Sequence, residues 1–353
     1  MPRRIVQVGV APSGIGSAWL RWIGESPDWT LAGVVDARAE HLSSAAQRAG
    51  LTPDQCFTTI HEAVTAIDFE ACALVVPSPL HATLCAQALE AGKHVVVEKP
   101  FTIDFAQARA LTEQAEQRGL RLMVDQNYRY IKEMGTLRRA LREQVAGPPA
   151  HVSVRFDCLW WPGRPYQWEM ANTMALEMAV HHFDSLRDVL GAEARTVQAR
   201  TWRPPWTRYR GDTFVEGLFE CDGGIHVAYH GSLESPGIRT PWPGLWQLEC
   251  ADGALHVADM GRDYGVYLSH SPDTVDWIEP VPADGVDQDT SILGTLHEFA
   301  TALEDQRRPQ CDARDNLRTL AIAFAVGRAS TEGRVVNVDH EFFPEEAPAE
   351  RRG

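Results

Sequence analysis

Hydrophobic positions in the first part of the chain form short runs that alternate with amphipathic segments. Residues 5–10, 31–36, 73–77 and 94–98 are rich in Val, Ile, Leu and Ala, as is typical of strands buried on both faces. Helices are predicted over residues 14–25 and 81–91, and residues 121–125 are expected to be the last strand of this part. Such alternation of strand and helix predicts a parallel sheet with right-handed crossovers.

The pattern changes in the second part of the chain. From about residue 151 to 257, short strands are separated by Gly and Pro turns, and Asp222-Gly223-Gly224 is typical of a hairpin. One helix is predicted over residues 174–190, and two more close the chain near 288–305 and 314–330. We expect a largely antiparallel sheet with one face covered, and we place the domain boundary near residue 125.

Length and composition agree with two domains in a protein of the cell interior. The 353 residues exceed one ordinary domain, and the net charge of -15 argues against nucleic acid or an anionic membrane as a partner. Seven scattered cysteines, an odd number, indicate free thiols. No apolar run approaches the roughly 20 residues of a membrane helix. With no room for a signal peptide before residue 5, we expect a cytoplasmic location.

The turn after the first strand has the pattern of a dinucleotide site. Gly9, Ala11 and Gly14 give G-x-A-x-x-G between a strand and a helix, and Asp36 ends the next strand 22 residues later. Small residues let the backbone approach a pyrophosphate, although an ordinary turn has similar composition. Asp36 would bind an adenosine ribose and repel a 2′-phosphate, which favours NAD. Arg38 leaves NADP open, because it either stacks on adenine or neutralises that phosphate.

Lys99 is the first candidate for catalysis. The chain has 33 Lys and Arg residues but only three are Lys, and one of these follows a buried strand at Glu98-Lys99-Pro100. Ligands of open α/β sheets bind at the carboxyl ends of the strands. Lys, unlike Arg, takes part in proton transfer. The structural alternative is an ion pair with Glu98.

The predicted helix 174–190 carries the second candidate set. Glu177, His181, Asp184 and Asp188 share one stripe, spaced four, three and four residues apart. This is either a solvated polar face or a carboxylate one turn from a proton-accepting histidine. His182 points about 100° away from His181, so the sequence does not favour a metal site here.

These motifs together resemble the Gfo/Idh/MocA oxidoreductases over almost the whole chain. The resemblance rests on the glycine turn, Asp36, residues 77–81, Ala91-Gly92-Lys93-His94, Glu98-Lys99-Pro100, residues 127–130, the helix around Glu177 and His181, and residues 315–336. It implies an α/β fold: a doubly wound Rossmann domain over residues 1–125. Residues 126–353 would form an α+β domain for substrate binding and oligomerisation, with a large, mostly antiparallel open sheet.

The resemblance also implies an activity and a set of site residues. Family members oxidise or reduce a secondary alcohol of a sugar, inositol or related polyol with NAD or NADP, and often assemble as dimers or tetramers. Lys99 and His181 would lie at the nicotinamide end, and Glu177 replaces the usual Asp. The expected cofactor contacts are Gly9, Ala11, Ser13, Gly14, Ile15, Asp36, Arg38, Pro77, Ser78, His81, Glu98, Lys99 and Asn127. The expected substrate contacts are Tyr128, Arg129, Trp161, Tyr166, Trp168 and His182.

The aromatic candidates lie in a Pro/Gly-rich loop just before the catalytic helix, where their rings would stack on a sugar; core packing is the alternative. Two other functions remain open at this point. One is cleavage of a glycoside through transient oxidation by tightly bound NAD. The other is a dinucleotide-binding sensor without turnover, an idea that the unusual Glu177 favours and the pair Lys99 and His181 disfavours.

Overall fold

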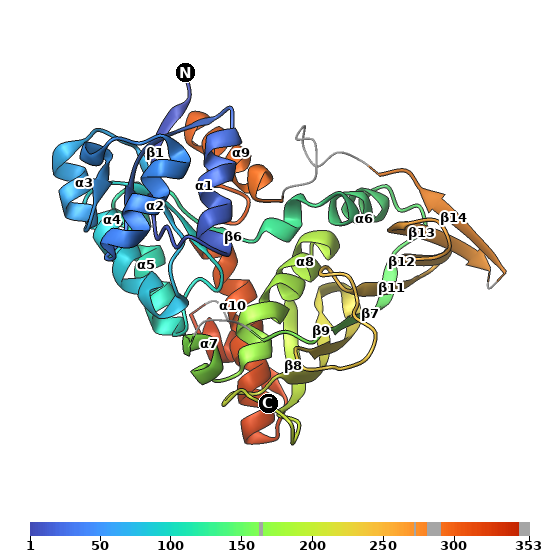
Figure 1. Ribbon diagram of the computed structural model, residues 1–353. Helices are drawn as coiled ribbons and strands as arrows, with labels where there is room; N and C mark the ends of the chain where they lie inside the picture. Colours follow the sequence, from blue (N-terminus) through green and yellow to red (C-terminus); the bar gives the residue numbers. More distant parts are fainter. Residues whose placement is uncertain (162–164, 272, 281–290, 346–353) are drawn as a thin grey trace. The chain divides into compact units, whose positions relative to one another are not determined.

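The chain forms two compact units. The computed structural model describes residues 1–161, 165–271, 273–280 and 291–345 (Figure 1). The first unit takes the described residues of Met1–Tyr130 and Val286–Leu317, and the second those of Ile131–Gly285 and Arg318–Gly353. The sequence placed the boundary after residue 125 and did not predict that a late segment returns to the first unit.

The first unit is built on a parallel sheet with strand order β3-β2-β1-β4-β5-β6. The strands are β1 (Arg3–Val8), β2 (Trp29–Val35), β3 (Cys56–Phe57), β4 (Ala71–Leu74), β5 (His94–Glu98) and β6 (Leu122–Asp125). Each neighbouring pair is parallel. The order reverses between β1 and β4, which is the position where such sheets bind ligands. The predicted doubly wound sheet is confirmed.

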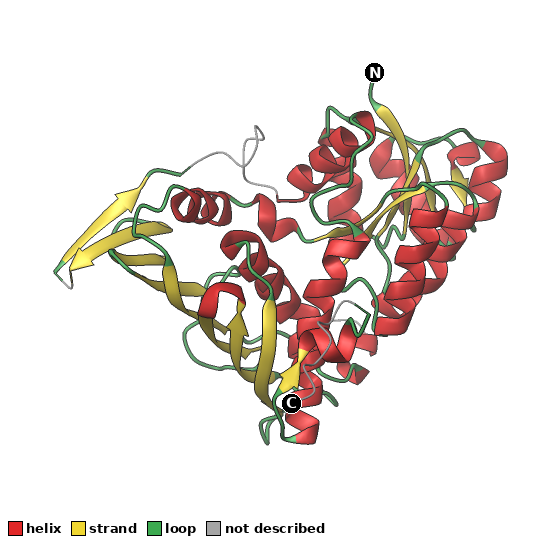
Figure 2. Ribbon diagram, turned by 180° about the vertical axis from the view of Figure 1, so that it is seen from behind, coloured by secondary structure: helices red, strands yellow, loops and turns green. Residues whose placement is uncertain are grey.

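Two groups of helices pack against this sheet, and Figure 2 shows helices on both sides of its strands. In the first group, α1 (Ile15–Glu25) contacts α2 (Ala39–Ala49) and α9 (Ser291–Glu304). In the second group, α4 (His81–Glu90) contacts α3 (Ile60–Ala66) and α5 (Phe105–Gln117). Helix α9 comes from the returning segment. Trp29 stacks on its Phe299 with ring centroids 5.5 Å apart and donates from Nε1 to Leu296 O at 2.8 Å. The late segment therefore completes the core of the first unit.

The second unit is built on a larger, mostly antiparallel sheet. Its described strands have the order β14-β13-β12-β11-β7-β10-β9-β8-β15. They are β7 (Pro149–Asp157), β8 (Ala194–Trp202), β9 (Phe214–Cys221), β10 (Ile225–Ser232), β11 (Leu245–Cys250), β12 (Gly253–Asp259), β13 (Tyr264–Ser271), β14 (Thr274–Ile278) and β15 (Val336–Asn337). Among these strands, β10 and β7 pair in parallel. The hairpin at Asp222–Gly224 joins antiparallel β9 and β10, as predicted.

The helix that was predicted over 174–190 changes type along its length. It begins as a π-helix at Met174–Ala179 and continues as α8 (Val180–Leu190). Phe183 anchors it on the sheet, with its ring centroid 5.5 Å from Phe219 and 5.0 Å from Tyr229. The wider π-turn changes which side chains of this helix share a face. Such π-turns are frequent at functional sites.

The other α-helices of the described ranges are α6 (Lys132–Arg142), α7 (Pro165–Glu169), α10 (Ala313–Glu332) and α11 (Val338–Phe342). None of the helices in the described ranges is long and apolar enough to cross a membrane.

Candidate functional site

The turn after β1 has a backbone that only small residues tolerate. Gly9 has φ +89° and donates its N–H to Val35 O at 2.8 Å. A Cβ at this position would lie 2.3 Å from Val75 O. Gly14, with φ +70°, precedes α1, which begins at the half-buried Ile15. Ala11 is half-buried and Ser13 is exposed, so the loop presents backbone and small side chains to solvent.

The side chain of Gln7 stabilises this loop through hydrogen bonds to its backbone. It is fully buried within β1, and its Nε2 donates to Gly9 O at 3.0 Å and Gly16 O at 2.8 Å. These two bonds join the end of the strand to the first turn of α1. Sequence reasoning missed this residue, although a glutamine inside an apolar strand was an available signal, since a buried amide must find partners.

Asp36 fixes the same loop from the neighbouring strand. Its Oδ2 accepts from Val10 N–H at 3.0 Å, and its Oδ1 accepts from Arg38 N–H at 3.0 Å. His41 of α2, which the sequence did not single out, places Nδ1 3.1 Å from Oδ2. The side chains of Asp36 and His41 are 13% and 17% exposed, so the carboxylate keeps an open side. Arg38 is exposed beside it.

The segments after β4 and β5 are held together by His81. Its Nδ1 lies 2.8 Å from Pro100 O and its Nε2 2.9 Å from Val76 O, and the ring is fully buried. The prediction that His81 binds cofactor does not fit this placement, because both ring nitrogens face backbone carbonyls. It instead shapes the loop that carries Pro77 and Ser78, which are half-buried and buried respectively.

Lys99 lies at the carboxyl end of β5, on the edge that also carries the glycine loop and Asp36. It is half-buried, and Glu98 before it is buried and accepts from Trp19 Nε1 at 2.7 Å. On the next strand, burial raises the pKa of Asp125 well above its usual range. The first unit therefore gathers one lysine and two buried acids at the expected edge.

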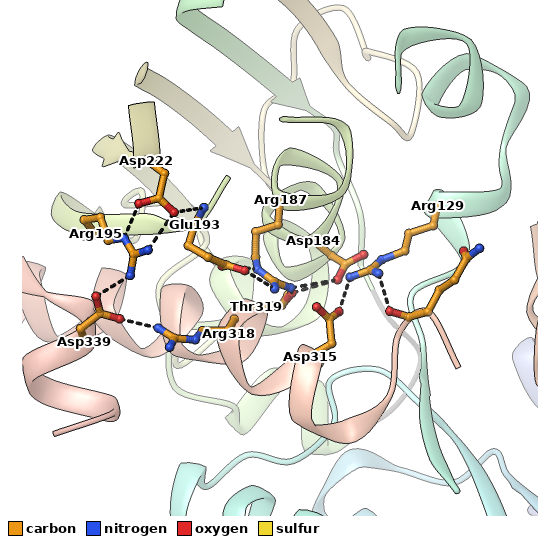
Figure 3. Close-up of polar contacts among 11 residues, drawn as sticks. Arg129, Asp184, Arg187, Glu193, Arg195, Asp222, Asp315, Arg318, Thr319 and Asp339 are labelled. Atoms are coloured by element: carbon orange, nitrogen blue, oxygen red, sulfur yellow. Dashed lines mark hydrogen bonds and ion pairs between the residues drawn. The ribbon is translucent and has the colours of Figure 1, made fainter. Parts of the chain in front are cut away.

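Residues 127–130 are only partly available to ligands. Asn127 is half-buried and its Nδ2 donates to Ser291 Oγ at 2.9 Å, and Tyr128 is half-buried. Arg129 is buried, pairs with Asp315 at 2.6 Å and donates to Gln310 O at 2.8 Å (Figure 3). The predicted substrate contact of Arg129 does not fit, because its guanidinium ties this turn to the returning segment.

In the second unit, Glu177 and His181 are buried, with exposed fractions of 5% and 6%. This burial contradicts the alternative that they belong to a solvated helix face. Gln167 Nε2 from α7 donates to Glu177 Oε2 at 3.3 Å. A buried carboxylate held by a neutral amide, one turn before a histidine, is suited to orient a ring or a substrate hydroxyl.

His182 points into the packing between helix and sheet. It is fully buried, with Nδ1 2.8 Å from Tyr229 Oη and Nε2 3.0 Å from Trp242 O. Burial lowers the pKa of this histidine to about 4. The prediction that it contacts substrate does not fit a ring whose nitrogens both face protein groups.

The remaining acids of the predicted stripe are structural. Asp184 Oδ1 accepts from Thr319 Oγ1 at 2.8 Å, and Asp188 pairs with Arg138. Figure 3 shows the chain of contacts that continues from Asp184 through the second unit. It runs through Arg187, Thr319, Glu193, Asp222, Arg195, Asp339 and Arg318.

The aromatic candidates differ in exposure. Trp161 is 47% exposed and lies under the guanidinium of Arg208, 4.1 Å from its ring centroid. Tyr166 and Trp168 are half-buried on α7 rather than in a loop. Trp168 packs on Tyr209 with ring centroids 4.8 Å apart. Burial is the main cause that raises the pKa of Tyr209. The charge of Glu234 raises this pKa further, and the charge of Glu177 adds a smaller increase.

Comparison with known proteins agrees with this geometry. Residues 3–126 match the oxidoreductase family with an NAD-binding Rossmann fold, and residues 134–256 match the Gfo/Idh/MocA C-terminal domain. The chain is 31% identical over 323 residues to the uncharacterized protein y4oX of Sinorhizobium fredii, covering 87% of each chain. It is 27% identical to D-apiose dehydrogenase of Paraburkholderia graminis, covering 89% of this chain and 84% of the relative.

A solved structure has the same fold over nearly the whole chain. It is an oxidoreductase from Agrobacterium radiobacter in complex with NAD+, L-tartaric acid and magnesium. The TM-score is 0.85 at 18% identity, with 96% of this chain and 99% of the other covered.

Proposed function

Because the chain belongs to the Gfo/Idh/MocA family of oxidoreductases with an NAD-binding Rossmann fold, we propose that it is an NAD-dependent sugar or polyol dehydrogenase. It would oxidise or reduce a secondary alcohol of a sugar, inositol or related cyclic polyol. The name of the D-apiose dehydrogenase relative supports a sugar. The observation that carries the proposal is the glycine loop, braced by Gln7 and bound to the Asp36 carboxylate.

The residues of the first unit fit a bound dinucleotide. The loop from Gly9 to Gly14 has no large side chain, and backbone N–H groups at a helix start favour a pyrophosphate. Asp36 retains acceptor capacity for ribose hydroxyls, since each carboxylate oxygen has two lone pairs. NAD would supply the hydride acceptor of the oxidation, and the protein supplies geometry and charge.

Oxidation of an alcohol removes hydride from its carbon and a proton from its hydroxyl, and a protein side chain must accept that proton. By the family resemblance, His181 would take the proton of the reacting hydroxyl while hydride passes from its carbon to NAD, which leaves a carbonyl. Lys99 would donate a hydrogen bond to the same oxygen and stabilise its developing negative charge. Glu177, held by Gln167, orients His181 or a substrate hydroxyl.

A screen of cyclic polyols and sugars, followed by absorbance of the reduced cofactor, tests the activity. On the best substrate, Lys99→Ala and His181→Ala should each lower turnover by roughly 10²–10⁴-fold while NAD affinity changes little. Lys93→Ala is the matched control, because Lys93 lies at the other end of β5, where its Nζ donates to Phe69 O. Near-full turnover of either active-site variant would refute the role given to that residue.

Turnover of the wild type and of a Glu177 variant distinguishes an enzyme from a sensor. Glu177→Gln preserves shape and should lower turnover with little effect on stability, because the amide cannot supply the negative charge. A wild-type protein that binds NAD and turns over none of the screened polyols would favour a sensor. Product formation without net release of reduced cofactor would favour glycoside cleavage.

A further inference from the structure

Two acidic side chains end neighbouring strands of the first unit at the edge that carries Lys99. Glu98 is the last residue of β5 and Asp125 the last of β6, and the register pairs them directly. Paired residues on adjacent strands project to the same face of a sheet, so the carboxyl groups meet. Their exposed fractions are 7% and 1%. Two carboxylates that share a buried site cannot both ionise readily.

Each carboxyl group also has its own hydrogen-bond donor. Trp19 Nε1 of α1 donates to Glu98 Oε1 at 2.7 Å, and Thr295 Oγ1 of α9 donates to Asp125 Oδ1 at 2.6 Å. The register places the two carboxyl groups side by side, and the presence of Glu98 raises the pKa of Asp125. Because an ionised carboxylate only accepts hydrogen bonds, a direct hydrogen bond between two carboxyl groups requires one proton.

Asp125 is the member of the pair whose surroundings favour the protonated form. Burial raises the pKa of Asp125 well above its usual range, and the charge of Glu98 raises it further. The hydrogen bond from Thr295 and the positive charge of Lys99 act in the opposite direction without reversing the shift. Burial and like charge therefore favour a pair that shares one proton and carries one negative charge.

We propose that Glu98 and Asp125 act as a one-proton acid pair that positions Lys99, by fixing a single negative charge beside it at the end of β5. This inference rests on the proposed function, in which Lys99 acts on the reacting hydroxyl. A second negative charge would draw the ammonium group toward the strand ends, and loss of both charges would remove its counter-charge. Asp125 is thus a positioning residue that acts through Glu98 and Lys99.

Three amide variants test the charge count. Asp125→Asn mimics the protonated acid and leaves Glu98 ionised. Glu98→Gln removes the charge of Glu98, while burial continues to raise the pKa of Asp125. We expect Asp125→Asn to keep turnover close to that of the wild type, whereas Glu98→Gln should lower it. The double variant Glu98→Gln/Asp125→Asn has no charge, and its turnover should fall on the order of tenfold to a hundredfold.

Thr295→Val is the matched control for geometry. It removes a hydrogen bond of the same network without changing the charge, so its turnover should stay near that of the wild type. If Thr295→Val costs as much as the double variant, hydrogen bonding rather than charge matters and the proposal is wrong. It is also wrong if Asp125→Asn loses as much turnover as the double variant, or if a folded double variant retains full turnover.

The proton shared by Glu98 and Asp125 can be detected by spectroscopy without measuring activity. Infrared spectroscopy of the wild type at neutral pH should show a protonated carboxylic acid band that Asp125→Asn removes, and its absence would overturn the proposal even if the variants fail to fold. Turnover of the wild type should also decline at alkaline pH as the proton leaves, and Asp125→Asn should lack this decline. Full turnover of Lys99→Ala would instead refute the proposed function and leave the infrared result intact.

Discussion

Substituting Gly9 with alanine tests how tightly the dinucleotide loop is built. An added Cβ would lie 2.3 Å from Val75 O and 2.7 Å from Val76 Cγ1, and φ is +89°. The left-handed backbone costs a residue with a Cβ about 1–2 kcal/mol, and forcing a methyl group into packed atoms costs about 1–3 kcal/mol more. We therefore expect Gly9→Ala to lower the free energy of unfolding by about 2–5 kcal/mol.

The control is Gly24→Ala in the neighbouring helix α1. A Cβ there meets nothing within 4 Å, so alanine should raise the free energy of unfolding by about 0.5–1 kcal/mol. Urea titration measures both variants, and NAD titration of the folded fraction shows whether Gly9→Ala also weakens binding. A loss of less than about 1 kcal/mol in Gly9→Ala would show that the loop relaxes, contrary to this reasoning.

Three further predictions concern the cofactor and pH. NAD should bind more tightly than NADP, because Asp36 would meet the 2′-phosphate at a cost of about 1–4 kcal/mol, and equal affinities in fixed-salt titrations would contradict this. Ala11→Leu should weaken NAD binding without unfolding the protein, as measured by the same titration beside circular dichroism; unchanged affinity would mean that the phosphate lies elsewhere. Burial depresses the pKa of His182 from 6.5 to about 4, so the stability it contributes is present above 6.5 and is lost as pH falls toward 4. His182→Gln should remove about 3 kcal/mol of that pH dependence in urea titrations, and an unchanged slope would refute the assignment.

The sequence predicted most reliably what depends on local periodicity. The strand that ends at Glu98 and the turn at Gly9 were placed correctly, because a buried strand and a positive-φ turn each constrain residue type within a few positions. The NAD-binding fold followed from the same motifs and is confirmed. The antiparallel second sheet was likewise visible in the hairpin at Asp222–Gly224.

Partners that are distant in the chain could not be predicted in this way. The buried rings of His81 and His182 look like functional histidines in a sequence, since only tertiary contacts show which carbonyls and hydroxyls face them. Arg129 was misassigned for the same reason, because its partner Asp315 lies far along the chain. The π-turn at Glu177 leaves no periodic signal, as it shifts the register by hydrogen bonding alone.

The returning segment has a consequence for how the protein is made. All strands of the parallel sheet precede residue 131, yet the carbonyl that binds Trp29 and the ring that stacks on it belong to α9. The ribosome must first synthesise residues 131–285, which at about 5–20 residues per second takes roughly 8–30 seconds. During that delay the nascent chain exposes an apolar face that α9 will later cover. A chaperone can bind this face during the delay, and a truncation after Tyr130 would leave the face permanently open.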